Sequence, residues 1–87
     1  MTEIRAHRLK RLHMRSMRRG IKEMDIILSR YAAARLEHMD EAALDQYDLL
    51  LDENDHDLYQ WVSGQVRAPD ALKVLIADIA EVVKTAE

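Results

Sequence analysis

Hydrophobic residues recur along most of the chain three or four positions apart, which is the spacing of one face of an α-helix. Over residues 4–17 only Leu9 and Leu12 form a narrow apolar stripe among many arginines, so we expect a mostly exposed basic helix there. Gly20 follows this stretch. Because glycine costs about 1 kcal/mol inside a helix, the sequence predicts a bend or a helix boundary at residues 18–20.

The next two amphipathic stretches are broader. The first predicts a helix whose apolar face comprises Ile21, Met24, Leu28 and Tyr31, widened by Ile27 and Ala32. Asp40 is a suitable N-cap for the following helix, since its carboxylate can accept hydrogen bonds from the free amides of the first turn. This third helix is expected to bury Leu44, Tyr47, Leu50 and Leu51.

The last two expected helices are separated by Gly64 and Pro69. The polar run 52–55 predicts a turn, and either Asn54 or Asp55 can cap a short fourth helix carrying Leu58, Tyr59, Trp61 and Val62. Gly64 is expected to end that helix, and Pro69 suits the first turn of a fifth. The fifth apolar stripe is Leu72, Leu75, Ile76, Ile79 and Val83. The sequence therefore predicts an all-α fold, a small bundle of five helices forming one domain over residues 1–87.

Composition and charge narrow the functional classes. The 87 residues contain no cysteine, which excludes a disulfide framework, a thiolate nucleophile and a cysteine-based zinc site. No apolar run approaches the roughly 20 residues of a membrane span, so no membrane insertion is expected. The net charge of −3 is unevenly distributed: residues 1–22 carry +7 and the remainder carries −10. Such a molecule can bind an acidic partner, a phosphate-bearing ligand or its own other half.

The sequence gives little indication of a metal-binding, catalytic or phosphate-binding site. The four histidines, His7, His13, His38 and His56, lack the spacing of a metal site, so no metal is expected. The nine carboxylates of residues 37–57 do not follow a calcium loop, and they are interpreted as a solvated face with helix caps, or else as a contact for a basic partner or for the first helix. Ser16 and Ser29 are expected at exposed helix positions, and no catalytic set or phosphate cradle is found. We therefore expect no catalytic residues and no enzyme activity.

The basic segment also suggests nucleic-acid binding, because its eight cations could neutralise several phosphates. The acidic overall charge, the aromatic residues outside that segment and the lack of a helix-turn-helix pattern weigh against it. A toxin-neutralising or other protein-interaction module using the basic helix is a further alternative. An organellar presequence is also compatible with an arginine-rich start.

One short motif carries a resemblance to a known family. Arg19-Gly20-Ile21-Lys22-Glu23 resembles the RGxxE signature of the small flavinylation factors known as succinate dehydrogenase assembly factor 2. The order of the surrounding segments is also similar over residues 8–64: an arginine-rich helix, an apolar helix, the pair Leu50-Leu51, an acidic turn and Leu58-Tyr59-Gln60-Trp61. One departure is Met17, because relatives often place an aromatic residue shortly before the motif.

The resemblance implies a non-enzymatic assembly factor with a five-helix fold. Such a factor binds the flavoprotein subunit of succinate dehydrogenase, and in some bacteria that of fumarate reductase, and promotes covalent attachment of FAD to it. FAD is then the partner's cofactor, and none belongs to the chain itself. The partner-binding residues implied are Arg19, Gly20, Glu23 and Asp25. The implied location is the bacterial cytoplasm or, in a eukaryote, the mitochondrial matrix, with the free protein a monomer.

The residues of the motif allow a physical interpretation. Arg19 and Glu23 would lie one helical turn apart and could pair with each other or with a partner. Gly20 would leave the backbone accessible to a partner surface. We therefore expect Arg19 and Glu23 to point outward at a bend. The alternative is an exposed ion pair worth about 0.3–0.5 kcal/mol with no further role.

Overall fold

Helices account for most of the residues that the structure describes. The computed structural model describes residues 3–85, in which five α-helices and one short 3₁₀-helix follow one another along the chain. The elements are α1 (Arg5–Arg15), α2 (Lys22–Arg35), η1 (Leu36–His38), α3 (Glu41–Leu51), α4 (Asp55–Val62) and α5 (Lys73–Thr85). The predicted all-α fold of five helices is confirmed. The additional turn η1 was not predicted, since it continues the pattern of α2.

The helix boundaries follow from local chemistry. Asp40 caps α3, and its side chain accepts a hydrogen bond of 2.8 Å from the amide of Ala43. Of the two candidate caps of α4, Asn54 makes the bond, accepting from the amide of His56 at 2.8 Å. Gly64 follows the end of α4 with φ +82°, a left-handed conformation that glycine adopts without strain. These residues confirm the predicted start of α3 and the predicted start and end of α4.

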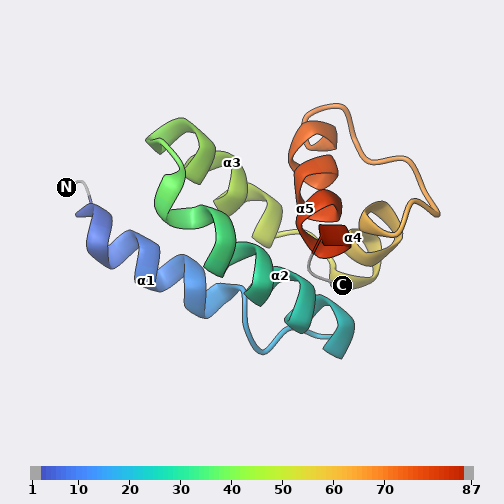
Figure 1. Cartoon of the computed structure of the whole chain (residues 1–87), viewed down its shortest axis with the longest axis horizontal. Helices are drawn as coiled ribbons and strands as arrows, with labels where there is room; N and C mark the ends of the chain where they lie inside the picture. The colour runs from blue at the N-terminus through green and yellow to red at the C-terminus, as the bar shows by residue number, and fades with distance from the viewer. Residues whose placement is uncertain (1–2, 86–87) are drawn as a thin grey trace.

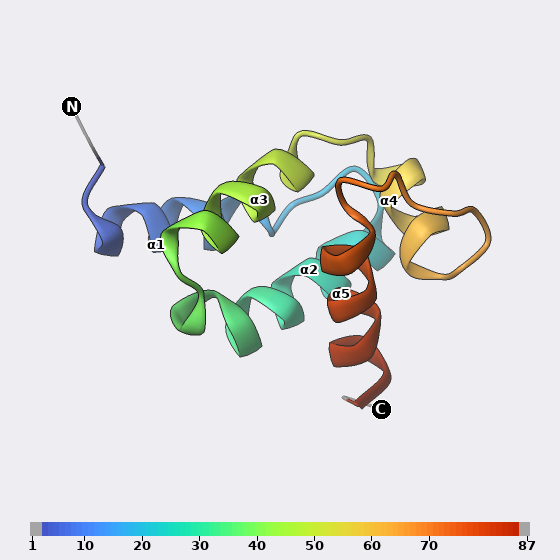
Figure 2. The same cartoon turned by 90° about the horizontal axis from the view of Figure 1, so that it is seen from above.

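Helix α2 is the centre of the fold. It contacts α1, α4 and α5 and continues directly into η1. Figure 1 shows α1, α2 and α3 running alongside one another with alternating direction, while α4 and α5 lie at the other end of the molecule. Seen from above, α5 crosses the direction of α2 (Figure 2). Fully buried side chains of α2, among them Met24, Leu28 and Tyr31, therefore form the middle of one hydrophobic core.

The C-terminal part departs from the prediction at two points, the position of Pro69 and the last residue of the buried stripe of α5. Pro69 does not lie in the first turn of the last helix, because α5 begins only at Lys73 and Pro69 forms a turn in which its carbonyl accepts from the amide of Leu72 at 2.9 Å. The side chain of Val82 rather than Val83 completes the buried stripe of α5. Trp61 is only partly buried and packs on the edge of the core.

Ser16 lies inside the core, contrary to the expected exposed position. Its side chain is completely buried, and its hydroxyl donates to the carbonyl of Leu12 at 2.7 Å. A second hydrogen bond of 2.6 Å joins the hydroxyls of Ser16 and Tyr47. Ser29 is partly buried rather than exposed. A small polar residue can be buried in this way because a helix carbonyl and a neighbouring hydroxyl satisfy its hydrogen bonds.

Candidate functional site

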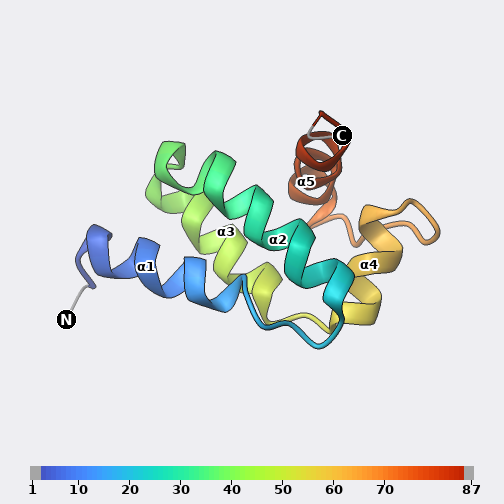
Figure 3. The same cartoon turned by 60° about the horizontal axis from the view of Figure 1, so that its bottom comes forward.

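The connection between α1 and α2, residues 16–21, carries the first half of the RGxxE motif and is called the motif loop here. Figure 3 shows it running beneath α2 towards the start of α4. Arg18 has a left-handed backbone with φ 55°, an unusual conformation for a residue with a side chain. Its amide donates to Asp25 Oδ2 at 3.0 Å, so the carboxylate of Asp25 holds this turn from the first part of α2.

Arg19 points into the molecule rather than outward. Only 11% of its side chain is exposed. Its Nε donates to Asp55 Oδ1 at 2.8 Å, and its two terminal nitrogens donate to the carbonyls of Arg15 at 2.9 Å and Leu51 at 3.1 Å. Its ion-pair partner is therefore Asp55 and not Glu23. The expectation that both motif side chains point outward is wrong for Arg19.

The planar guanidinium explains why Arg19 suits this position. Its nitrogens face in different directions, so one side chain reaches the C-terminal ends of α1 and α3 together with the first residue of α4. A cation is favourable at the two carbonyl ends, and the carboxylate of Asp55 is favourable at the amide end of α4. Arg19 thus joins three helix ends at one point.

Gly20 leaves room for the same carboxylate. The Gly20 amide donates to Asp55 Oδ2 at 2.5 Å, so both oxygens of Asp55 are bound by adjacent residues of the motif loop. A Cβ placed on Gly20 would lie 2.9 Å from Asp55 Oδ2, closer than such atoms normally approach. The small size of Gly20 therefore serves an internal contact, and Gly20 is also exposed, so its accessibility to a partner surface stays a prediction.

Glu23 is the motif residue that faces solvent. It lies in the first turn of α2, is exposed, and has no ion pair or side-chain hydrogen bond with the residues the structure describes. Further exposed side chains surround it in sequence, including Met17 at 49% and Ile26 at 43% exposure. We call this set the exposed motif surface: Met17, Arg18, Lys22, Glu23 and Ile26. It combines apolar side chains with charges of both signs.

The basic residues of α1 are largely bound to α3. Arg8 pairs with Glu41 at 2.9 Å and with Asp45, while Arg11 pairs with Asp48 at 3.0 Å. Arg15 continues the series by binding Asp48 and Asp52, the latter at 2.6 Å. These arginines and carboxylates form the α1–α3 ion network. Four of the nine carboxylates of the acidic stretch are thus bound to the protein's own first helix, an interpretation that the sequence left open, while Asp40 caps α3 as the other interpretation expected.

The network perturbs the ionisation of its members. Hydrogen bonding from Arg11, together with the positive charges of Arg11 and Arg15, lowers the pKa of Asp48 despite its partial burial. Hydrogen bonds from Arg11 likewise lower the pKa of Glu3. Hydrogen bonds to Glu3 and Asp48 raise the pKa of Arg11. Three arginines of the basic segment, Arg8, Arg11 and Arg15, are therefore paired with carboxylates of the protein itself. This pairing weakens the nucleic-acid interpretation.

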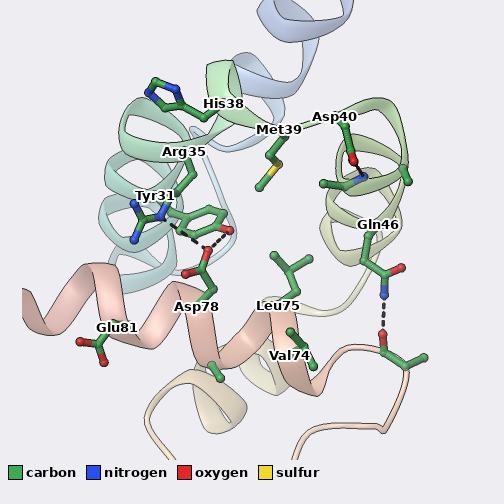
Figure 4. A pocket seen from close by; sticks show the side chains of 14 residues that line it. Tyr31, Arg35, His38, Met39, Asp40, Gln46, Val74, Leu75, Asp78 and Glu81 are labelled. Atoms are coloured by element: carbon green, nitrogen blue, oxygen red, sulfur yellow. Dashed lines mark hydrogen bonds and ion pairs between the residues drawn. The ribbon is translucent and has the colours of Figure 1, made fainter.

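A second surface feature lies away from the motif loop. A groove of about 1040 Å³ runs between the end of α2, α3 and α5, lined by apolar side chains and alanines together with polar and charged residues such as Gln46, Asp78 and Glu81. In Figure 4 Met39, Leu75 and Val74 line it, and Tyr31 and Arg35 both reach Asp78 at its wall. Burial and the hydrogen bond to Asp78 raise the pKa of Tyr31. None of the four predicted site residues lines this groove.

Residues 3–85 hold no group of three or more histidine or acidic side chains arranged to bind a metal ion. Across the same residues, the helices are too short or too polar to span a bilayer.

Residues 10–83 match the family described as flavinator of succinate dehydrogenase, a range that includes the motif loop, Glu23 and Asp55. The chain belongs to this family. The family resemblance inferred from the RGxxE motif is confirmed.

Curated relatives agree with this membership. The chain is 41% identical over 71 residues to succinate dehydrogenase assembly factor 2, mitochondrial, of Schizosaccharomyces pombe, covering 82% of this chain and 51% of that protein. It is 44% identical over 61 residues to the protein of the same name from Meyerozyma guilliermondii, covering 70% and 45%. With the Scheffersomyces stipitis protein the identity is 51% over 53 residues, covering 61% and 36%. The chain thus spans about half the length of these relatives or less.

Asp55 is the residue of this site that sequence reasoning missed. It was assigned only as a possible helix cap, and its partners Arg19 and Gly20 lie 36 and 35 positions away. No local spacing links residues so distant in sequence. The one available signal was the opposite net charge of residues 1–22 and of the rest of the chain. This difference indicates attraction between the two segments but does not identify a pair of residues.

Proposed function

We propose that the chain is an assembly factor that binds the flavoprotein subunit of succinate dehydrogenase and promotes covalent attachment of FAD to a histidine of that subunit. The observation that carries the proposal is the family match over residues 10–83. The names of the relatives, which call them succinate dehydrogenase assembly factors, support it further. FAD belongs to the partner in this scheme, and the chain requires no cofactor of its own.

The chain's contribution is a binding surface rather than a set of reacting groups. The exposed motif surface offers the Glu23 carboxylate as a hydrogen-bond acceptor and ion-pair partner, and it also includes the exposed, flexible apolar side chain of Met17. Binding of the flavoprotein in the conformation that brings FAD and the acceptor histidine together lowers the ordering required at the transition state. The bond then forms within the partner, and the chain acts as a clamp and not as an enzyme.

The four predicted site residues divide into two roles under this proposal. Glu23 contacts the partner directly, because its side chain is exposed at the start of α2. Arg19, Gly20 and Asp25 act through the motif loop, because their contacts lie within the fold. Partner binding by Arg19 is thus proposed to be indirect.

The Glu23 role is tested by Glu23→Gln, with Glu81→Gln as the matched control. Both glutamates are exposed and lie on helices, but Glu81 is on α5. Both variants should change the free energy of unfolding by less than about 0.5 kcal/mol. Glu23→Gln should weaken flavoprotein binding roughly ten-fold or more and lower the covalent flavin fluorescence of the denatured subunit. Normal covalent flavin with Glu23→Gln would remove Glu23 from the proposed site.

The cellular setting of the proposal follows from the partner. The relatives are named as mitochondrial proteins. We propose that this chain acts in whichever compartment loads the flavoprotein, the mitochondrial matrix in a eukaryote or the cytoplasm in a bacterium. We further propose that it is a monomer when free and that the fumarate reductase flavoprotein is a second client in bacteria that contain one.

A further inference from the structure

Asp55 uses its whole carboxylate on the motif loop. One oxygen binds Arg19 Nε at 2.8 Å and the other binds the Gly20 amide at 2.5 Å, while only 15% of the side chain is exposed. Asp55 is the first residue of α4, and α4 packs against both α2 and α5. The loop is therefore attached to a separate, packed part of the molecule (Figure 3).

We infer that Asp55 is a positioning residue that fixes the motif loop so that Glu23 and its exposed neighbours are presented in one arrangement. The inference rests on the proposed function for its consequence in partner binding. Gly20 directly precedes Ile21, the N-cap residue of α2, and lies three positions before Glu23, so the contact with Asp55 is made beside the start of this helix. A loop released from Asp55 would let the start of α2 fray, because the N-cap residue Ile21 makes no side-chain capping bond.

The same geometry gives a physical reason for glycine in the motif. Because a Cβ on residue 20 would lie 2.9 Å from Asp55 Oδ2, any larger residue displaces the carboxylate that binds the loop. Gly20→Ala therefore disturbs the same contact that Asp55→Ala removes. Their effects should coincide when combined, whereas two independent contributions would multiply.

The first test needs no partner. Amide hydrogen exchange is measured at Gly20 in the wild type, in Asp55→Asn and in Asp57→Asn. Asp57 lies in the same first turn of α4 and is exposed, so its variant matches the change of charge. Loss of the charged acceptor should speed exchange of the Gly20 amide by about ten-fold or more in Asp55→Asn alone. Equal exchange rates in all three proteins would overturn the inference.

The second test measures flavoprotein affinity at a temperature at which every variant is folded by circular dichroism. Gly20→Ala and Asp55→Ala should each weaken binding about ten-fold, and the double variant should bind as Asp55→Ala does. Asp57→Asn should bind as the wild type. Multiplied effects in the double variant, or unchanged binding by Asp55→Ala, would contradict the positioning role.

The two proposals fail in distinguishable ways. If the wild-type chain did not bind the flavoprotein or raise its covalent flavin, the proposed function would be rejected, while exchange at Gly20 would still report whether Asp55 fixes the loop. If the wild type bound and Asp55→Asn bound equally well with an unchanged Gly20 amide, the positioning role alone would be rejected.

Discussion

A hydroxyl pair is buried where α1 meets α3. The hydroxyls of Ser16 and Tyr47 lie 2.6 Å apart, and both side chains are fully buried. Burial raises the pKa of Tyr47 to about 12, so the phenol remains protonated and available for hydrogen bonding at physiological pH. The Tyr47 ring in turn packs against Tyr31, with ring centroids 5.6 Å apart. Ser16 therefore connects the start of the motif loop to the central core.

Removing the Ser16 hydroxyl should be costly for its size. Ser16→Ala leaves the Tyr47 hydroxyl buried without this partner, and the free energy of unfolding should fall by about 1–3 kcal/mol. The double variant Ser16→Ala/Tyr47→Phe removes both polar groups and should lose less than the sum of the single changes. Urea denaturation measures all four proteins. A change below about 0.5 kcal/mol in Ser16→Ala would show that the hydroxyl pair contributes little.

At the scale of elements, α1 is held by two different interactions. Leu12 is buried and Leu9 packs against the core, while Arg8, Arg11 and Arg15 bind the carboxylates of α3. The apolar stripe of α1 is narrow, as the sequence predicted, so the ion network supplies much of the specificity of its docking. Individual exposed ion pairs contribute little, but Arg11 and Arg15 share Asp48 and form a connected set.

Because of the α1–α3 ion network, the free energy of unfolding should depend on pH. The folded state lowers the pKa of Asp48, so the stability this residue contributes is present above its unfolded pKa and is lost as the pH falls through the folded value. Urea denaturation between pH 7 and pH 3 should therefore show stability falling towards the acid end. Asp48→Asn should have lower stability at pH 7 and a shallower decline below about pH 4. An identical pH profile in the variant would contradict the assignment.

The sequence predicted the positions of the helices better than it predicted the side-chain contacts between them. Helix periodicity and caps located α3 and α4, because Asp40 and Gly64 act on backbone groups within a few residues. The direction of Arg19 could not be read from spacing, because both Glu23 and Asp55 are acceptors and only the packing of α4 beside the loop selects Asp55. Ser16 was misplaced for a related reason: its partner Tyr47 is 31 positions away. The family resemblance located the site, but the division into internal and exposed residues required the fold.

In the molecule as a whole, positive charges near the start of the sequence pair in the fold with negative charges that lie later in the sequence. Residues 1–22 carry +7 and the remaining chain carries −10, yet Arg8, Arg11, Arg15 and Arg19 each bind carboxylates beyond residue 40. The two segments therefore attract each other in the folded state. Cations without such contacts in the described chain include Arg18 and Lys22, which belong to the exposed motif surface.

Ionic strength distinguishes this pairing from general charge repulsion. Raising NaCl from 0.05 to 1 M shortens the screening length to about 3 Å, so the free energy of unfolding should fall, by about 1 kcal/mol in all. A molecule of net charge −3 stabilised mainly by relief of repulsion would instead become more stable. The variant Arg11→Gln/Arg15→Gln should start lower and respond less to salt, because it lacks the shared pairs at Asp48. Urea denaturation is suitable because urea leaves the ionic strength unchanged. If the free energy of unfolding of the wild type rose with NaCl, the network would not dominate the electrostatics of the fold.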